Sequence, residues 1–280
     1  MEYPTFFGET LPVISRAVDD DDDELLPHDI NCDVSVRWTP IAKEELSKTS
    51  DDNRLECNML FIAIDLEASG FVETFLLHDE MTELLATVSV DVEDDISDSS
   101  RRHHLAATTD KHCFVRRLKN KPSVLFVLST LQVSQYQTPS WTDQLFSHLS
   151  MSNADVVVLT TNLVSRYHSE QCQSDLLAPF LRSLNTSTFS GRPCAPYLEQ
   201  PNVISGLAAQ IMTYLEIHQV SGVLYTCYKD VSFVDIKTMK LFCKILHSPP
   251  IRDYAVKNPN ADTQLVQLAE LHRDKSTLYI

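Results

Sequence analysis

Glycine is scarce in this sequence, which has 5 glycines in 280 residues. Loops that cradle phosphate, and the tight turns of dinucleotide-binding folds, need glycine for close backbone approach and for positive φ angles. The P-loop, G-x-G-x-x-G, G-x-S-x-G, C-x-x-C and H-E-x-x-H motifs are also absent. We therefore expect no cofactor and no catalytic residues. An enzyme on a nucleoside-phosphorylase-like α/β scaffold is the alternative, and only fold analogy supports it.

Metal-binding residue types occur in the sequence without the spacing of a site. The nearest cluster combines His103 and His104 with His112 and Cys113. Adjacent histidines on an extended segment point in different directions, and no second pair is placed to complete a tetrahedron. We therefore expect no metal ion.

Signals for export or membrane insertion are also missing. The first residues lack the basic region and the apolar stretch of a secretory signal. The longest apolar runs, such as residues 59–64, are too short to span a bilayer. The seven cysteines are odd in number and scattered, which favours reduced thiols. We therefore expect a cytoplasmic protein with no membrane partner, and the nucleus is the alternative location.

The chain is acidic, with a formal net charge of −16 and an isoelectric point of about 4.9. An acidic chain repels nucleic acid and anionic lipid, so neither is an expected partner. Part of this charge lies in residues 19–24, an unbroken run of six acids. Like charges in such a run repel one another and cannot bury a core. We therefore expect residues 1–31 to form a mostly disordered acidic segment.

Periodicity of apolar residues predicts an α/β protein. Continuous apolar runs, typical of buried strands, occupy 59–65, 123–128, 154–160 and 222–228, and alternating patterns predict strands at 34–38 and 84–92. Helical spacing of apolar residues occurs at 71–77, 139–149, 203–217, 235–246 and 261–272. Residues 166–201 lack such periodicity and are expected to form a long irregular segment. This interleaving predicts one domain over residues 32–272, a three-layer α/β/α fold with a mixed, largely parallel sheet. In the last helix we expect Leu265, Leu268 and Leu271 to face inward.

The end of the chain predicts a docking motif. Residues 273–277 are polar and are expected to form a leash, so that 273–280 is a flexible tail ending in Leu278, Tyr279 and Ile280. A terminal carboxylate on such a tail can enter a narrow pocket and pair with a lysine or with backbone amides. The tyrosine ring can fill the pocket wall while its hydroxyl finds a partner. A frayed, inert tail is the alternative.

Several segments resemble the proteasome assembly chaperone 1 family. They are Thr5-Phe6-Phe7-Gly8-Glu9 ahead of the acidic run, Ala178 to Leu184, Leu198-Glu199-Gln200-Pro201-Asn202-Val203, Gly222 to Val231, and the hydrophobic-Tyr-any ending Leu278-Tyr279-Ile280. The strong match covers about residues 176–247 and the two termini.

This resemblance implies an α/β/α chaperone without catalytic activity. It implies a heterodimer with a second, related chaperone, proteasome assembly chaperone 2, that binds the outer face of the α-subunit ring of the 20S core. The family promotes ring assembly, prevents rings from dimerising and keeps regulatory particles off immature cores. The docking role falls on Leu278, Tyr279 and, through its carboxylate, Ile280. The Phe180-Leu181 region is expected at the heterodimer interface, although both side chains could equally serve the core.

Overall fold

A computed structural model describes residues 34–48, 53–77, 81–90, 112–169, 177–249 and 251–277, with side chains of the last helix described as far as residue 272. The predicted acidic segment and the docking tripeptide lie outside these residues. The domain boundaries 1–31, 32–272 and 273–280 therefore stay predictions. No helix within the described ranges combines the length and the apolar composition needed to cross a bilayer.

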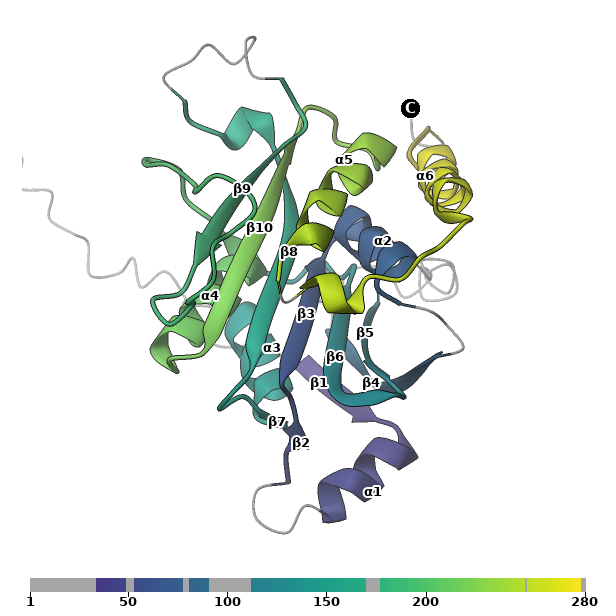
Figure 1. Cartoon of the computed structure of the whole chain (residues 1–280), viewed down its shortest axis with the longest axis vertical. Coiled ribbons are helices and arrows are strands. Elements are labelled where there is room, and N and C mark those ends of the chain that lie inside the picture. Colours follow the sequence, from purple (N-terminus) through teal and green to yellow (C-terminus); the bar gives the residue numbers. More distant parts are fainter. Residues whose placement is uncertain are drawn as a thin grey trace, which may run out of the picture. The chain divides into compact units, whose positions relative to one another are not determined.

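An eight-stranded sheet forms the centre of the molecule, in the order β1-β4-β5-β6-β3-β8-β10-β9 (Figure 1). The strands are β1 Val34–Trp38, β3 Met59–Ile64, β4 Thr82–Val90, β5 Cys113–Leu118, β6 Lys121–Ser129, β8 Asp155–Leu163, β9 Phe180–Asn185 and β10 Ser221–Lys229, and a separate two-stranded pair is β2 Leu55–Glu56 with β7 Leu149–Ser150. The adjacent strands β6, β3, β8 and β10 pair in parallel, whereas the pairs on either side are antiparallel. The expected mixed sheet is confirmed, and its parallel part is confined to these four central strands.

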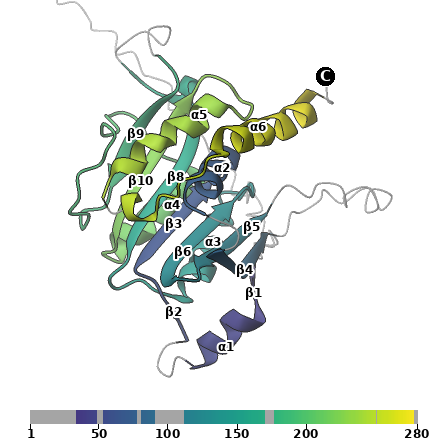
Figure 2. The same cartoon turned by 45° about the vertical axis from the view of Figure 1, so that its right-hand side comes forward.

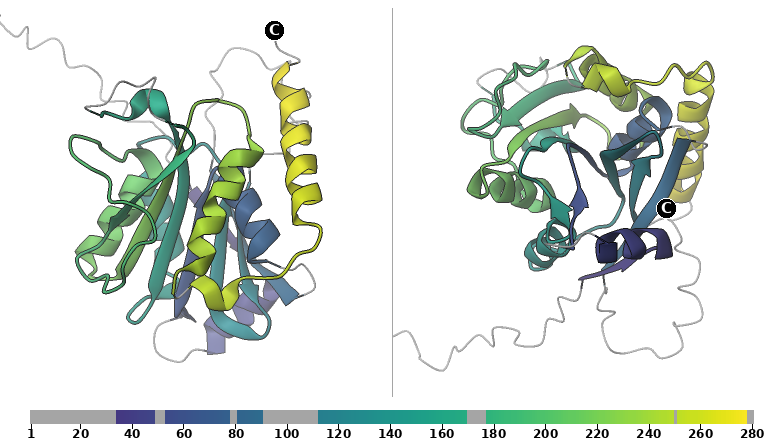
Figure 3. Two further views of the ribbon diagram at one scale, coloured as in Figure 1. Left: turned by 45° about the horizontal axis from the view of Figure 1, so that its top comes forward. Right: turned by 60° about the horizontal axis from the view of Figure 1, so that its bottom comes forward.

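Helices cover both faces of the sheet (Figures 2 and 3). They are α1 Pro40–Lys48, α2 Leu66–Phe75, α3 Thr138–Phe146, α4 Gly206–Ile217, α5 Ile236–Leu241 and α6 Ala261–Thr277. Residues of α1, α3 and α4 share one hydrophobic core with the sheet, whereas α2 and the 3-10 turn Phe242–His247 after α5 share the core on the other face. Helix α6 contacts α2 and α5 rather than the sheet, so it forms an outer layer over α2. The three-layer class is confirmed.

The burial of each strand follows from its place in the sheet. Five of the six residues of β3 are buried, because helices cover this central strand on both faces. The edge strand β1 alternates instead, with Val34 buried and Ser35 and Arg37 exposed. One face of β1 therefore meets water, as the alternation in its sequence predicts.

Helix α1 and strand β9 are among the elements that were not predicted from the sequence. Helix α1 lies in a mostly polar stretch that shows no apolar stripe. In the structure only Ala42 and Leu46 of its nine residues are buried. Strand β9 lies inside the segment 166–201, which reads as irregular, and it is held by antiparallel pairing with β10. Both elements depend on contacts distant in sequence, which local periodicity does not reveal.

Several predicted helix boundaries were wrong, among them the starts of α2 and α4 and the end of α6. Helix α2 begins at Leu66, five residues before the predicted start, so Gly70 lies inside the helix. Helix α4 begins at Gly206 rather than at Val203. Helix α6 does not end at His272 but continues to Thr277. The segment 273–277, expected to be a leash, is therefore helical.

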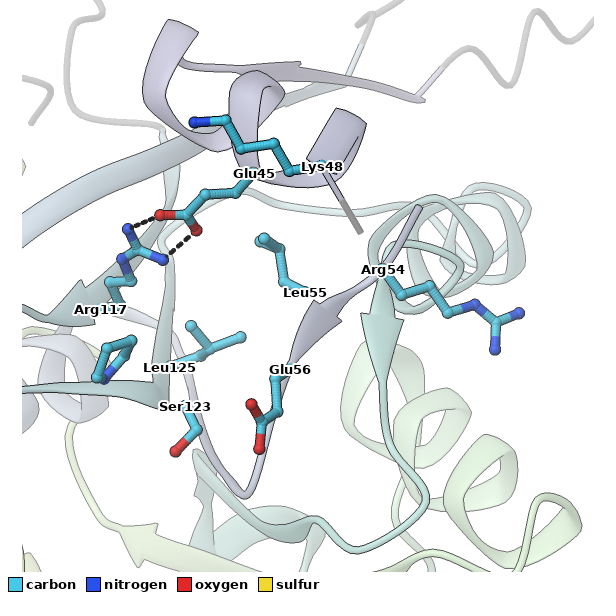
Figure 4. Close-up of a pocket in the computed structure, with 9 residues that line it drawn as sticks. Glu45, Lys48, Arg54, Leu55, Glu56, Arg117, Ser123 and Leu125 are labelled. Carbon is cyan, nitrogen blue, oxygen red and sulfur yellow. Dashed lines mark hydrogen bonds and ion pairs between the residues drawn. The ribbon is translucent and has the colours of Figure 1, made fainter. Parts of the chain in front are cut away.

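A buried arginine joins α1 to the antiparallel half of the sheet. The Arg117 side chain, 9% exposed, points from β5 toward α1. Its Nη2 donates to Oε1 of Glu45 at 2.6 Å, and Nη1 donates to the second oxygen of the same carboxylate (Figure 4). Nε donates to Glu83 of β4. The hydrogen bonds to Glu45 are the main cause that raises the pKa of Arg117 and lowers that of Glu45. This clamp holds α1 in place where few apolar contacts do so.

Replacing Arg117 by Ala should destabilise the fold, because two carboxylates lose their partner at a partly buried site. We expect the free energy of unfolding in urea to fall by about 2–3 kcal/mol. The control is Lys48→Ala, which removes the exposed ion pair with Glu44 on the same helix; it should change stability by less than about 0.5 kcal/mol. Equal effects of the two substitutions would show that the clamp does not hold α1.

Candidate functional site

The predicted docking residues Leu278, Tyr279 and Ile280 lie outside the described residues, but the element that carries them is described. Helix α6 ends at Thr277, the residue directly before Leu278. The described part of the candidate site is therefore α6, together with the contacts that fix this helix on the rest of the domain.

One face of α6 packs into the domain. Leu265 is completely buried and Ala269 is 9% exposed, and both contact a small apolar cluster that includes Met239 of α5. Leu268 is half-buried against the same cluster. The prediction for Leu271 was wrong, because its side chain is 58% exposed. The buried positions 261, 265 and 269 recur every four residues, which places them on one side of the helix.

Gly70 allows this close approach. A Cβ atom at position 70 would lie 3.1 Å from Sδ of Met239 and 3.2 Å from Cδ1 of Leu268. Both distances are shorter than ordinary van der Waals contact, so the side chains of Met239 and Leu268 would have to move by a few tenths of an ångström to admit a Cβ atom. Gly70 lies in the middle of α2, where glycine disfavours the helix. The absence of a side chain at this position thus lets Met239 and Leu268 pack close to α2.

Polar contacts fix the start of α6. Nδ2 of Asn258 donates to the carbonyl oxygen of Thr74 at 3.1 Å and to Oε1 of Gln264 at 2.7 Å. The backbone N–H of Val256 donates to the carbonyl oxygen of Phe75 at 2.8 Å. These contacts bind the segment before α6 to the last residues of α2 and satisfy carbonyl groups at the end of that helix.

Helix α2 is itself fixed by a cluster of buried charges at the carboxyl ends of the parallel strands. Asp65 follows β3 and caps α2, accepting a hydrogen bond from the N–H of Ala68 at 3.0 Å. Its other oxygen accepts from the N–H of Thr161 of β8 at 2.6 Å and from the hydroxyl of the same residue at 3.0 Å. Glu67, 3% exposed, forms an ion pair with Lys229, 7% exposed, at the end of β10. Four elements therefore meet through these side chains.

The environment of Asp65 disfavours its charge. Burial, and next the charge of Glu67, raise the pKa of Asp65 to about 7, against the opposing effect of the hydrogen bonds from Ala68 and Thr161. The backbone at Asp65 has φ of 87°, a conformation that non-glycine residues rarely adopt. Nearby, burial raises the pKa of the Cys227 thiol to about 12, so this thiol carries no charge at neutral pH.

In open α/β sheets, ligands bind at the carboxyl ends of parallel strands. Here the polar groups at that edge are engaged with one another: Asp65 with Thr161, and Glu67 with Lys229. Their mutual pairing gives them a structural role in fixing α2.

A cavity of about 370 Å³ lies beside the Arg117 clamp. Figure 4 shows Glu45 turned toward Arg117 across this cavity, whereas Arg54 points away from it. Nε of Arg54 instead donates to the carbonyl oxygen of Ser147 at 3.2 Å. The buried cation at this cavity is already paired with carboxylates, so it does not favour an acidic ligand.

The Phe180-Leu181 region, expected at a partner interface, contributes to the folded chain itself. Leu181 is 5% exposed and belongs to the core beneath α2. The Phe180 ring lies 5.0 Å from that of Tyr167 and 5.4 Å from that of Tyr228, measured between centroids. On the same strand Leu184 is 38% exposed. Of these residues, Leu184 is the one most accessible to a partner.

The string from Leu198 to Asn202, which carries part of the family resemblance, also has a structural role. Glu199 accepts a hydrogen bond from Nε of Arg182 at 2.9 Å, and the guanidinium carbon lies 4.8 Å from the centroid of the Phe180 ring. Asn202 accepts from the N–H of His168 at 2.8 Å and donates to the carbonyl oxygen of the same residue at 2.9 Å. The string thus holds β9 and the segment after β8 together.

Sequence reasoning missed most of the residues that support α6 and α2. Leu265 and Leu268 were found by helical spacing, but nothing local distinguishes Gly70 as a packing position. Glu67 and Lys229 lie 162 positions apart, so no short pattern joins them. The sequence did carry a signal for Arg117. It lies two positions after Val115 and four after Cys113, so all three side chains lie on the same buried face of β5.

The raised pKa of Asp65 predicts a pH dependence of stability. Between about pH 4 and 7 the unfolded chain has lost this proton and the folded chain has kept it, so folding takes up a proton and stability falls as pH rises. Asp65→Asn cannot titrate. We therefore expect the stability of the wild type, relative to that of Asp65→Asn, to fall between pH 5.5 and 7 with a slope of up to about 1.4 kcal/mol per pH unit. Urea unfolding of both proteins measures this difference, and a constant difference across that range would contradict it.

Comparisons with known proteins agree with the sequence resemblance. A family model with the description "Proteasome assembly chaperone 4", named PAC1, matches residues 3–280. Proteasome assembly chaperone 1 of Xenopus laevis is 31% identical over 289 aligned positions, covering 99% of each chain. The protein of the same name from Danio rerio is 33% identical over 248 positions, covering 87% of this chain and 89% of the relative.

The fold comparison points the same way. The crystal structure of Pyrococcus furiosus PbaA, an archaeal homolog of proteasome-assembly chaperone, matches with a TM-score of 0.54 at 9% identity. The match covers 89% of this chain and 100% of that one; at this identity it shows the fold alone. Together with the sequence matches over nearly the whole length, these findings show that the chain belongs to the proteasome assembly chaperone 1 family.

Proposed function

We propose that this chain docks on the α-subunit ring of the 20S proteasome through Leu278, Tyr279 and Ile280, and that it does so as a heterodimer with a second, related chaperone, proteasome assembly chaperone 2. The pair promotes ring assembly, prevents rings from dimerising and keeps regulatory particles off immature cores. The observation that carries the docking role is the position of the tripeptide directly after the described end of α6. Family membership supports the role in assembly.

Each residue of the tripeptide contributes a different contact. Leu278 supplies apolar surface, and Tyr279 adds a ring whose hydroxyl can donate or accept a hydrogen bond. Ile280 carries the terminal carboxylate if the chain ends where the sequence does, and a lysine or backbone amides in the ring pocket would bind it. The contacts are few, so their geometry matters more than their area.

The charge of the chain supports a protein partner. A net charge of −16 favours association with basic surfaces and opposes binding to nucleic acid or to anionic membranes. The expected location, the cytoplasm with the nucleus as the alternative, belongs to this proposal.

Exposed apolar side chains support a heterodimer surface near β9 and α4. Among the described residues, the large exposed apolar side chains of the 177–217 segment are Leu177, Leu184, Tyr197, Val203 and Ile217, with exposures from 38% to 90%. These side chains belong to the edge strand β9, to α4 and to the segments before and between them. A related chaperone that covers this end of the sheet would remove them from water.

Removing residues 278–280, or replacing Tyr279 by Ala, should weaken binding to purified α-ring intermediates by about tenfold or more, since both changes remove contacts made in the ring pocket. The melting temperature and the heterodimer should be unchanged, because the folded contacts described for α6 involve residues 261–272. The control is Tyr136→Ala, which removes an exposed tyrosine elsewhere (68% exposed). Full ring binding by the truncated chain in a quantitative pull-down would refute the docking role.

The protein isolated from its own cells should carry its partners with it. Native mass spectrometry should show a one-to-one complex with a related chaperone, and heavier species that add proteasome α subunits. Mild salt should remove the α subunits before the chaperone, because charge-dependent contacts weaken as ionic strength rises. A monomer or a homodimer without α subunits would count against the proposal.

A further inference from the structure

The docking tripeptide follows a helix without an intervening linker. The sequence predicted a polar leash over 273–277, but α6 runs through these residues to Thr277. A helix has one path, whereas a leash of the same length samples many. The direction in which Leu278 leaves the domain is therefore tied to the direction of α6.

That direction is fixed by contacts along most of the helix. Ala261, Leu265 and Ala269 are buried on one face, and Asn258 holds the start of the helix to the end of α2. His272 is half-buried, and burial lowers its pKa against the opposing charge of Glu67. Contacts with the domain therefore continue to within six residues of Leu278.

Figures 2 and 3 show the consequence of this packing. The C-terminal end of α6 projects beyond the ends of α2 and α5, and its N-terminal part lies against them. With a rise of about 1.5 Å per residue, positions 273–277 extend the helix by about 8 Å, compared with up to about 17 Å for an extended chain. The helix thus sets the reach of the tripeptide as well as its direction.

We propose that α6 is a positioning strut, which holds the docking tripeptide at a fixed distance and angle from the domain so that tail and domain engage the ring together. Gly70 contributes to this position, because the absence of a Cβ atom lets Leu268 and Met239 pack close to α2. The proposal rests on the proposed function, since it concerns how the same tripeptide reaches its pocket. A preorganised tail loses less conformational freedom on binding than a flexible one. The effective concentration of the tail at the ring pocket is also higher when the domain binds the ring at the same time.

The test compares three forms of the full-length chain in complex with its partner chaperone. In the first, residues 273–277 are replaced by Gly-Ser-Gly-Ser-Gly, which keeps the length and the docking tripeptide but removes the helix. In the second, Asp274→Glu, Ser276→Ala and Thr277→Ala keep both the net charge and the helix, since glutamate and alanine favour helices. The third lacks residues 278–280. Affinity for α-ring intermediates and melting temperature are measured for each.

We expect the glycine-serine form to bind the ring about tenfold more weakly than the wild type with an unchanged melting temperature, and the helix-preserving form to bind as the wild type does. Loss of binding by the third form alone, with the glycine-serine form unaffected, would overturn the strut and leave the docking role intact. Equal losses in the first two forms would also overturn it, because the side chains rather than the helix would then matter. No loss in the third form would refute the docking role and the strut with it.

Discussion

The ion pair between Glu67 and Lys229, together with the cap formed by Asp65, fixes α2 on the sheet, and the outer layer of the molecule depends on that attachment. Asp65 connects the end of β3 to Thr161 of β8, and Lys229 connects the end of β10 to the first turn of α2. A buried pair of this kind contributes little net stability, but removing either partner leaves a charge without compensation. The cluster therefore specifies one position for α2, and α2 in turn supports α5 and α6.

The buried charged groups of this fold lie at the edge of the sheet where many α/β proteins bind their ligands. The carboxyl ends of parallel strands are where α/β enzymes place catalytic and ligand-binding groups. Here the groups at that edge, Asp65, Glu67 and Lys229, fix a helix. The proposed interactions with other proteins lie at the periphery: the exposed apolar side chains near β9 and α4, and the end of α6. A chaperone that binds a large protein surface needs such dispersed contacts more than it needs a cleft.

The sequence predicted the centre of this fold better than its margins. Continuous apolar runs located β3, β8 and β10, because strands covered on both faces exclude polar residues. Strand β9 was missed because its pairing with β10 joins segments some 40 positions apart, and α1 was missed because Arg117 rather than an apolar stripe holds it. The start of α2 was misplaced because helical spacing of apolar residues begins only at residue 71, whereas the cap is Asp65. The docking role of the last three residues stays a prediction, and the packing of the helix before them against Gly70 and Met239 is tertiary, so no local pattern reveals it.

Affinity limits suggest why the helical support matters to a chaperone. Three residues offer roughly 30 non-hydrogen atoms, and at about 0.3 kcal/mol per atom they supply at most some 9 kcal/mol. That corresponds to a dissociation constant of about 0.2 μM at best, before the cost of ordering a linker is counted. Ordering five linker residues would consume much of this energy, since each ordered residue costs about 1–2 kcal/mol. In the proposed docking, a tail held by α6 would avoid that loss and would still bind weakly enough to be released. A helix over 273–277 would thus reconcile a small docking motif with usable and reversible binding.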